Sequence, residues 1–208
     1  MSFLFNFARF SEAVRKDVEM VLQSLEGFEK PEANLEQYET PAVLASDLLH
    51  LAWSHGDLEG WVLDLGCGTG ILGIGAAIYG ASVVGVDIDR EALEIARKNA
   101  AKSDVSEATD WVRGEVSAVP VRHAETVVMN PPFGAQNKGA DRPFLRAAEN
   151  VADVIYTVHN QGSLEFVESF VDGEVTDAFE TTIELPRSFE FHDEEKSEIV
   201  VEVYRIEV

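Results

Sequence analysis

The chain has 208 residues, of which 46% are hydrophobic, enough for a folded domain with a sizeable core. Its 38 acidic and 16 basic residues give a formal net charge of −22. It has no run of about 18 apolar residues, so no membrane span is predicted. A single cysteine, Cys67, excludes an internal disulfide and a multi-cysteine zinc site, and no metal site is expected. The apolar start, MSFLFNFARF, has no small-residue cleavage site after it, so we expect a cytoplasmic protein.

The acidic residues are spread along the whole chain and do not form a tail. A dispersed excess of acid resembles the surface of proteins from salt-loving organisms, because the Debye length falls to about 3 Å near 1 M salt and self-repulsion is screened. A basic partner is the alternative, but partners usually produce patches. We therefore expect a halophilic source, and the net charge does not exclude a nucleic-acid substrate.

The first part of the chain is predicted to be helical. Over residues 11–26, apolar residues recur on one helical face, which predicts an amphipathic helix. The segment from Gly27 to Pro41 is irregular, and a second helix is predicted to begin near Thr40, with Pro41 in its first turn. We divide the chain into an N-terminal helical extension, residues 1–40, and a main domain, residues 41–208.

From Trp61 onward, strands and helices alternate. This alternation favours a parallel sheet covered by helices on both faces. The last two strand-like runs are joined only by a loop and predict an antiparallel hairpin at the sheet edge. The predicted strands are WVLDL, SVVGVD, ETVVMN, DVIYTVH, VTDAFETTIEL and EIVVEVYRIEV.

A glycine loop and an acid form the first candidate site. Gly66, Gly68 and Gly70 lie between a strand and a helix, where glycine allows a sharp turn and close approach of a ligand. Asp87 ends the next strand and can accept hydrogen bonds from a ribose diol. A dinucleotide site would prefer the spacing GxGxxG, and no Lys-Ser/Thr pair follows that would make a phosphate-binding loop. A plain tight turn is the remaining alternative.

The stretch NPPF, residues 130–133, forms the second candidate site. Two prolines end the preceding strand and fix the backbone, so Asn130 and Phe133 are displayed on a stiff loop. The side-chain oxygen of Asn130 and the carbonyl of Pro131 can accept the two hydrogens of an NH2 group, while Phe133 stacks on the flat group that bears it. Ligands of such folds lie beyond the carboxyl ends of the strands, so both candidate sites face one crevice. The alternative is a loop that only ends a strand.

The motifs DLGCGTG and GVDID together resemble the S-adenosylmethionine site of class I methyltransferases. The resemblance implies a Rossmann-like α/β fold with a mostly parallel seven-stranded sheet, a C-terminal antiparallel hairpin and helices on both faces. It also implies S-adenosylmethionine as cofactor, with Asp87 on its ribose and Glu115 near its adenine. Cys67 is interpreted as a small residue of this loop and not as a nucleophile, because no basic partner is in sight.

NPPF resembles the (D/N)PP(Y/F) motif of methyltransferases that modify exocyclic or amide nitrogens. The longer stretches GFEKPEANLEQYETP, MNPPFGAQNKGADRPFL and LPRSFEFHDEEKSEIVVEVYRI resemble the methyltransferase-like protein 5 family. That resemblance runs from about Gly27 to the C-terminus and implies N6-methyladenosine formation in small-subunit ribosomal RNA, with the LEQYxT segment holding part of the cofactor. The implied catalytic residues are Asn130, Pro131, Pro132 and Phe133. The implied cofactor residues are Gln37, Thr40, Asp64, Gly66, Gly68, Thr69, Gly70, Ile71, Asp87, Ile88, Glu115 and Val116.

RNA contacts are expected just after the NPPF loop. Lys138, Arg142 and Arg146 are the bases nearest to it, although solvated helix residues would look the same. His192 is a further candidate, but the acids 193–195 follow it where the family can carry lysines. The resemblance also implies a partner, a small zinc-binding activator subunit that adds to a sheet edge. The target adenine must be single-stranded or flipped to reach the loop.

Two other functions stay open at this point. An N5-glutamine methyltransferase of a release factor uses the same chemistry, but its motif usually carries Tyr, and its N-terminal domain is larger than this one. A cofactor-binding ribosome assembly factor, whose contacts matter more than its catalysis, is the other alternative.

Overall fold

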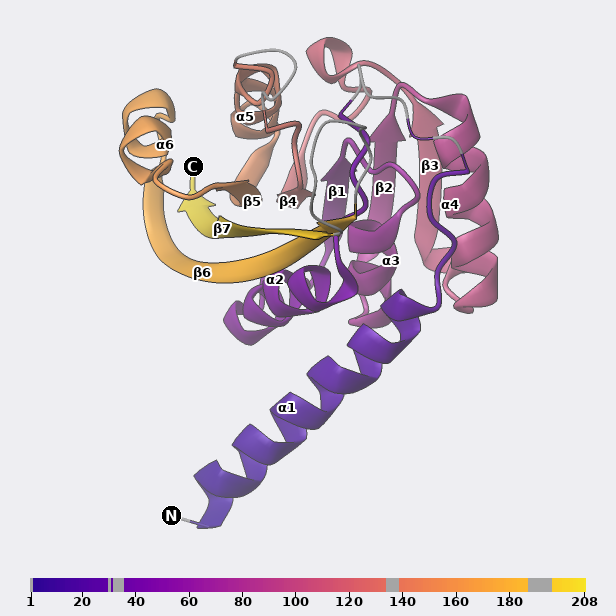
Figure 1. Cartoon of the computed structure of the whole chain (residues 1–208), viewed down its shortest axis with the longest axis vertical. Helices are drawn as coiled ribbons and strands as arrows, with labels where there is room; N and C mark the ends of the chain where they lie inside the picture. Colours follow the sequence, from indigo (N-terminus) through magenta and orange to yellow (C-terminus); the bar gives the residue numbers. More distant parts are fainter. Residues whose placement is uncertain (1, 30, 32–35, 134–138, 187–195) are drawn as a thin grey trace.

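The computed structural model describes residues 2–29, 31, 36–133, 139–186 and 196–208. Its centre is a seven-stranded sheet in the order β3-β2-β1-β4-β5-β7-β6 (Figure 1). Neighbours from β3 to β5 are parallel, whereas β7 pairs antiparallel with both β5 and β6. The strands are β1 (Trp61–Leu65), β2 (Ser82–Asp87), β3 (Thr109–Arg113), β4 (Ala124–Met129), β5 (Ala152–Asn160), β6 (Glu174–Pro186) and β7 (Lys196–Glu207). The predicted mostly parallel sheet with a C-terminal hairpin at its edge is confirmed.

Helices cover both faces of the sheet. One hydrophobic cluster joins the sheet to α1, α2, α3 and α4, and a second joins it to α5 and α6. Neighbouring residues of a strand enter different clusters, as Val62 and Leu63 of β1 do, because successive side chains point to opposite faces. The helices are α1 (Ser2–Gln23), α2 (Ala42–His55), α3 (Ile71–Ile78), α4 (Arg90–Lys102), α5 (Arg142–Glu149) and α6 (Leu164–Phe170). Two short 3-10 helices, η2 (Ser106–Ala108) and η3 (Val116–Ala118), flank β3.

The N-terminal helix projects from the body of the molecule, and its C-terminal part packs against the core (Figure 1). Val18 and Leu22 are buried there, on the predicted apolar face, and full burial of such a side chain contributes about 1.5–3 kcal/mol. The helix runs from Ser2 to Gln23, so it starts and ends earlier than the predicted 11–26. Pro41 is the residue before α2 and does not lie in its first turn as predicted.

The strand order determines where the site can form. β1 lies between β2 and β4, and all three run in the same direction. Their C-terminal ends, at Leu65, Asp87 and Met129, therefore lie along one edge of the sheet. Ligands of open α/β sheets bind at this edge, where the strand order reverses.

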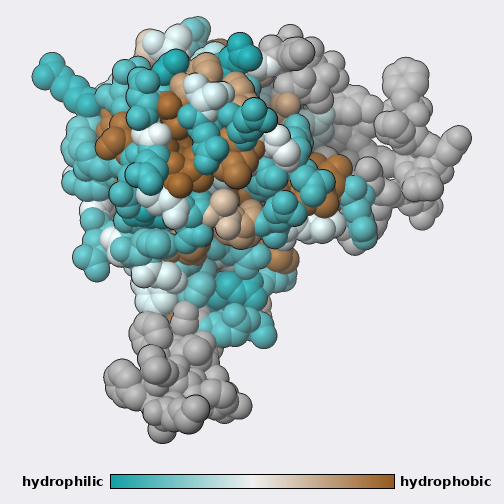
Figure 2. Space-filling view, turned by 90° about the vertical axis from the view of Figure 1, so that its left-hand side faces the viewer, coloured by the Kyte–Doolittle hydropathy of each residue, from teal (hydrophilic) through white to brown (hydrophobic). Residues whose placement is uncertain are grey.

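The surface around α6 and β6 carries mostly hydrophilic side chains with hydrophobic groups between them (Figure 2). β6 is an edge strand, and Glu174, Asp177 and Glu180 lie along it. Charged residues on an edge strand disfavour pairing with other chains. None of the described helices has both the length and the apolarity that a bilayer span requires.

Candidate active site

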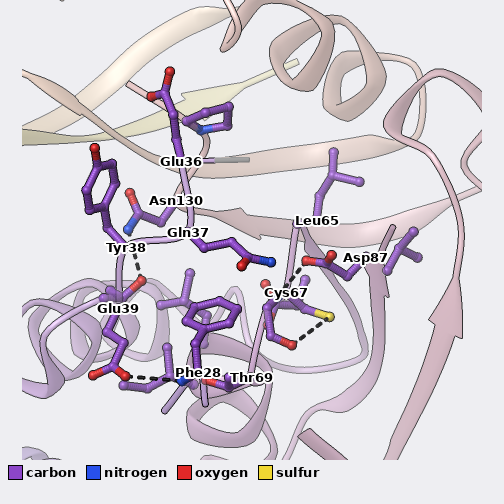
Figure 3. Close-up of a pocket in the computed structure, with 18 of the residues that line it drawn as sticks. Phe28, Glu36, Gln37, Tyr38, Glu39, Leu65, Cys67, Thr69, Asp87 and Asn130 are labelled. Carbon is purple, nitrogen blue, oxygen red and sulfur yellow. Dashed lines mark hydrogen bonds between the residues drawn. The ribbon is translucent and has the colours of Figure 1, made fainter. Parts of the chain in front are cut away.

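A cavity of about 670 Å³ lies at the carboxyl edge of β1, β2 and β4 (Figure 3). The cavity is enclosed by the glycine loop after β1, the ends of β2 and β4, residues 114–117 after β3, the N-terminal residues that precede α2, and Phe144 of α5. The predicted site residues that line it are Gln37, Thr40, Asp64, Gly66, Gly68, Thr69, Ile71, Asp87, Ile88, Glu115, Val116, Asn130 and Pro132. The two candidate sites of the sequence are therefore parts of one cavity.

The three glycines of the loop all have positive φ, at +74° for Gly66, +51° for Gly68 and +89° for Gly70. Side chains rarely adopt this conformation, so the loop requires glycine. A Cβ atom on Gly66 would lie 2.7 Å from the ring of Phe144, and one on Gly68 would lie 2.9 Å from the ring of Phe28. Two aromatic rings thus contact the loop from α5 and from the N-terminal segment.

Asp87 joins the end of β2 to the glycine loop. Its Oδ2 accepts a hydrogen bond from Gly68 N at 2.7 Å, and its Oδ1 accepts one from Asp89 N at 2.8 Å. Burial raises the pKa of this carboxyl, and the two backbone N–H donors oppose the rise. Each oxygen keeps a second lone pair, so the carboxylate can still accept hydrogen bonds from a diol.

Asp64 is buried below the loop and holds the start of α3. Its Oδ2 accepts a hydrogen bond from Gly73 N at 2.7 Å, in the first turn of that helix. Burial raises the pKa of Asp64 to about 7, and the nearby Asp87 carboxyl adds to the rise. The pKa of the Cys67 thiol is also raised by burial, which disfavours the thiolate and agrees with the interpretation of Cys67 as a small packing residue.

Asn130 follows β4 directly and faces the cavity. Its Nδ2 donates a hydrogen bond to Thr40 Oγ1 at 2.9 Å, and its Oδ1 is buried without a hydrogen-bond partner among the described residues. A buried acceptor left without a donor costs about 1–3 kcal/mol, so it marks a place where a ligand can bind. Pro132 lines the cavity beside it.

The ring of Phe133 is half-buried and packs against the first hydrophobic cluster. Phe133 and Pro131 are not among the residues that line the cavity, and neither is Gly70. The carbonyl of Phe133 accepts a hydrogen bond from Asn160 Nδ2 at 3.4 Å, which ties the loop to the end of β5. The stacking role of Phe133 stays a prediction.

Residues 25–28 and 36–42 cover the cavity from the N-terminal side. Gln37 Nε2 donates to Asp89 Oδ2 at 2.7 Å, and Phe28 N donates to Glu39 Oε1 at 3.2 Å. Glu36 is buried in a turn with a φ of +49°. Sequence reasoning missed Phe28, Tyr38 and Phe144 as lining residues. No pattern in the sequence marks these residues, because their contacts with the glycine loop join segments that are far apart in the chain.

The predicted RNA-contact residues divide into two groups. Arg142 and Arg146 are exposed on α5, and their guanidinium groups lie over the rings of Phe166 and Phe170 of α6 at 4.4 to 5.8 Å. Arg146 also pairs with Glu149 at 3.2 Å. Lys138 and His192 lie outside the described residues.

Comparison with known proteins decides the family. A family model described as the methyltransferase small domain matches residues 42–175. The rRNA N(6)-adenosine-methyltransferase METTL5 of Danio rerio is 34% identical over 201 residues, which cover 91% of this chain and 97% of that protein. The chain belongs to the METTL5 family of methyltransferases.

Two further relatives come from archaea. An uncharacterized protein of Methanocaldococcus jannaschii is 40% identical to this METTL5-family chain over 93% of its length and 94% of the relative's. A solved structure from Pyrococcus horikoshii, named as a proposed RNA methyltransferase, is 40% identical with a TM-score of 0.87, covering 93% of this chain and 97% of that one. The expected fold and family are thereby confirmed.

S-adenosylmethionine is the cofactor of this METTL5-family enzyme, and the cavity fits it. The glycine loop leaves no Cβ atom between its backbone and a ligand, and Asp87 presents carboxylate oxygens beside it. Ile88 and Val116 line the cavity with apolar side chains, next to Glu115 and Ser117, and their contact with an adenine ring stays a prediction. The carboxyls of Asp64, which is buried, and of Asp87, which is half-buried, also suit a cofactor that carries positive charge.

Proposed function

We propose that this protein methylates the N6 atom of an adenine in ribosomal RNA, in the small subunit. The observation that carries the proposal is the unpartnered Oδ1 of Asn130 inside the cofactor cavity. An amide oxygen at that place can accept a hydrogen of an exocyclic NH2 group. The names of three METTL5 relatives that are 30% to 34% identical support adenine in ribosomal RNA as the target.

The protein residues act by alignment. The bound cofactor supplies a methyl group on a positively charged sulfur. Asn130 Oδ1 and the carbonyl of Pro131 hold the two amino hydrogens, so that the nitrogen lone pair points into the cavity. The proline pair keeps both acceptors rigid. Correct orientation of two reacting groups can supply about 7–11 kcal/mol of the barrier reduction, and no strong base is needed because the nitrogen becomes acidic once it has taken the methyl group.

Two further parts of the proposal concern the salt concentration in which the protein works and its protein partner. The dispersed net charge of −22 supports a halophilic source and a cytoplasm of high salt. In high salt, phosphate attraction weakens, so RNA recognition relies more on stacking and shape than on a basic groove. A zinc-binding activator subunit adds a strand to an outer edge of the sheet, and β3 and β6 are the two outer strands. The acidic side chains along β6 disfavour pairing there, so β3 is the better candidate.

The test offers ribosomal RNA and total cell protein together to the enzyme with isotope-labelled S-adenosylmethionine in molar potassium chloride, with and without the activator subunit. Digestion and mass spectrometry then locate the label. Label on N6-methyladenosine of small-subunit RNA supports the proposal. Label on glutamine would make a release factor the substrate, and label on large-subunit RNA would refute the subunit choice.

A matched variant tests the mechanism. Asn130→Ala removes the acceptor at the end of β4 and should lower the methylation rate by at least about 100-fold, while S-adenosylhomocysteine still binds within about threefold of the wild-type affinity. Asn150→Ala, at an exposed position after α5, serves as the control. Normal methylation by Asn130→Ala would refute the role of this amide.

A further inference from the structure

The two ends of the Asn130 amide have different surroundings. Nδ2 donates to Thr40 Oγ1 at 2.9 Å, whereas Oδ1 is buried and has no partner among the described residues. A half turn of the amide would exchange the two atoms with little change in shape. The cavity would then meet an N–H donor, which cannot accept the hydrogen of an amino group.

Thr40 holds the Asn130 side chain at its Nδ2 end, because its hydroxyl oxygen accepts the hydrogen bond from Nδ2 at 2.9 Å. After a half turn the same hydroxyl would donate to Oδ1, and both hydrogens of Nδ2 would face the cavity without an acceptor. Only the observed orientation therefore offers an acceptor to an amino group. The backbone of the loop is already fixed by Pro131 and Pro132, so the hydrogen bond to Thr40 restricts the freedom that remains in the side chain.

Thr40 is itself fixed by its neighbours. It precedes Pro41, whose carbonyl begins the hydrogen bonding of α2 by accepting from Ala45 N at 3.0 Å. Three residues before it, Gln37 donates to Asp89 at 2.7 Å, and Asp89 N donates to Asp87 at 2.8 Å. The short segment 37–41 thus connects the carboxylate at the end of β2 with the amide at the end of β4.

We propose that Thr40 is a positioning residue for methyl transfer, which orients the Asn130 side chain so that its Oδ1 faces the amino group of the substrate. This inference rests on the proposed function and extends it, because it assigns Thr40 to the substrate side of the cavity as well as to the cofactor. Its effect on the reaction is exerted through Asn130.

The experiment compares Thr40→Val, which keeps the size and removes the hydroxyl, with Thr40→Ser, which keeps the hydroxyl. We expect Thr40→Val to lower kcat about 10-fold, the factor that corresponds to the loss of one hydrogen bond, and Thr40→Ser to restore most of it. The dissociation constant of S-adenosylhomocysteine, measured by calorimetry, should stay within about threefold of the wild type. Thr182→Val, at an exposed position on β6, is the matched control.

A second measurement does not depend on the methylation activity of the protein. In a spectrum of the 15N-labelled protein, the side-chain NH2 signals of Asn130 are identified by their absence in Asn130→Ala. Thr40→Val should shift these signals and speed their hydrogen exchange, and Thr182→Val should leave them unchanged. If the wild type methylates no adenine, the proposed function fails, and this spectrum still shows whether Thr40 holds the amide.

Two results would overturn the inference. One is a kcat of Thr40→Val within about twofold of the wild type, the smallest difference that kinetics resolve with confidence. The other is a loss of cofactor affinity as large as the loss of kcat/KM, which would make Thr40 a cofactor ligand only.

Discussion

The buried side chain of Asn99 on α4 binds both the backbone N–H and the backbone carbonyl of Glu26. Glu26 N donates to Asn99 Oδ1 at 2.8 Å, and Asn99 Nδ2 donates to Glu26 O at 2.9 Å. Nδ2 also donates to Thr69 O in the glycine loop at 3.0 Å. One amide therefore joins the end of the N-terminal segment to the loop that holds the cofactor.

Asn99→Ala should destabilise the protein and weaken cofactor binding together. Three hydrogen bonds are lost, and the backbone groups of Glu26 and Thr69 lose a partner, so the free energy of unfolding should fall by about 2–4 kcal/mol. Urea unfolding measures this change, and calorimetry measures the affinity for S-adenosylhomocysteine. Asn150→Ala is the control, since that amide makes a local hydrogen bond on the surface. A variant with normal cofactor affinity would show that the N-terminal segment does not need this anchor.

Gly66→Ala should lower the stability of the folded protein more than Gly56→Ala does. Both residues have positive φ, +74° and +81°, so each alanine pays about 1–2 kcal/mol of backbone strain. Only at Gly66 does the new methyl group meet another atom, the ring of Phe144 at 2.7 Å, because nothing lies within 4 Å of it at Gly56. Thermal unfolding of both variants separates strain from contact. Equal losses at the two sites would contradict a tight fit of Phe144 over the loop.

The sequence predicted the sheet and most of the site because the decisive residues are local. Gly66, Asp87 and Asn130 each lie at a strand end, and parallel strands place such ends along one edge. Contacts between distant segments could not be predicted in the same way. Thr40 was expected at the cofactor, and its hydrogen bond to Asn130 bridges 90 positions. Periodicity carries no information about pairs of that kind.

Helix ends were also only partly predictable. α1 begins at Ser2, nine residues before the predicted start at residue 11. The prediction began where charged residues separate the apolar ones, and it left out the mostly apolar stretch around Phe5 and Phe7. Phe28 and Phe144 were missed because an aromatic residue in a loop or short helix gives no pattern. Their role is visible only in the folded structure, where both rings lie against glycines of the loop.

The stability of the folded protein should depend on pH through the ionisation of Asp64. Folding raises the pKa of Asp64 from 3.8 to about 7. The stability that the protonated carboxyl contributes is therefore fully present below about pH 4 and is lost as the pH rises through 7. Asp64→Asn has no such ionisation. Relative to this variant, the cofactor-free wild type should lose on the order of 4 kcal/mol of unfolding free energy between pH 4 and 8. Asp110→Asn, exposed on β3, controls for loss of one charge. A constant difference across this range would contradict a buried, protonated Asp64.

Arg142→Ala should weaken RNA binding more than Arg146→Ala. The charge of Arg146 is partly neutralised by Glu149 at 3.2 Å and Asp172 at 3.7 Å, whereas Arg142 forms no ion pair with any acid that the structure describes. Filter binding over a range of salt should show the logarithmic salt slope falling by about one for Arg142→Ala. Arg90→Ala, exposed on α4 and paired with Glu94 at 3.1 Å, is the control. Equal slopes for all three variants would place the RNA elsewhere.

Salt should stabilise the folded protein strongly. With a net charge of −22, screening relieves repulsion in the compact state more than in the extended one. The unfolding temperature should therefore rise by at least about 10 °C between 0.1 M and 2 M potassium chloride, which corresponds to roughly 3–5 kcal/mol for a chain of this size. Sucrose at equal osmolality provides the uncharged control. An unfolding temperature independent of salt would contradict a halophilic source.

The anchors of the N-terminal segment have a consequence for synthesis on the ribosome. Glu26 pairs with Asn99, Gln37 with Asp89 and Thr40 with Asn130, across 73, 52 and 90 positions. The first forty residues leave the ribosome long before their partners are made, and they can only close over the cavity once β4 has been translated. The segment that is made first therefore completes these contacts only after β1 to β4 have been made.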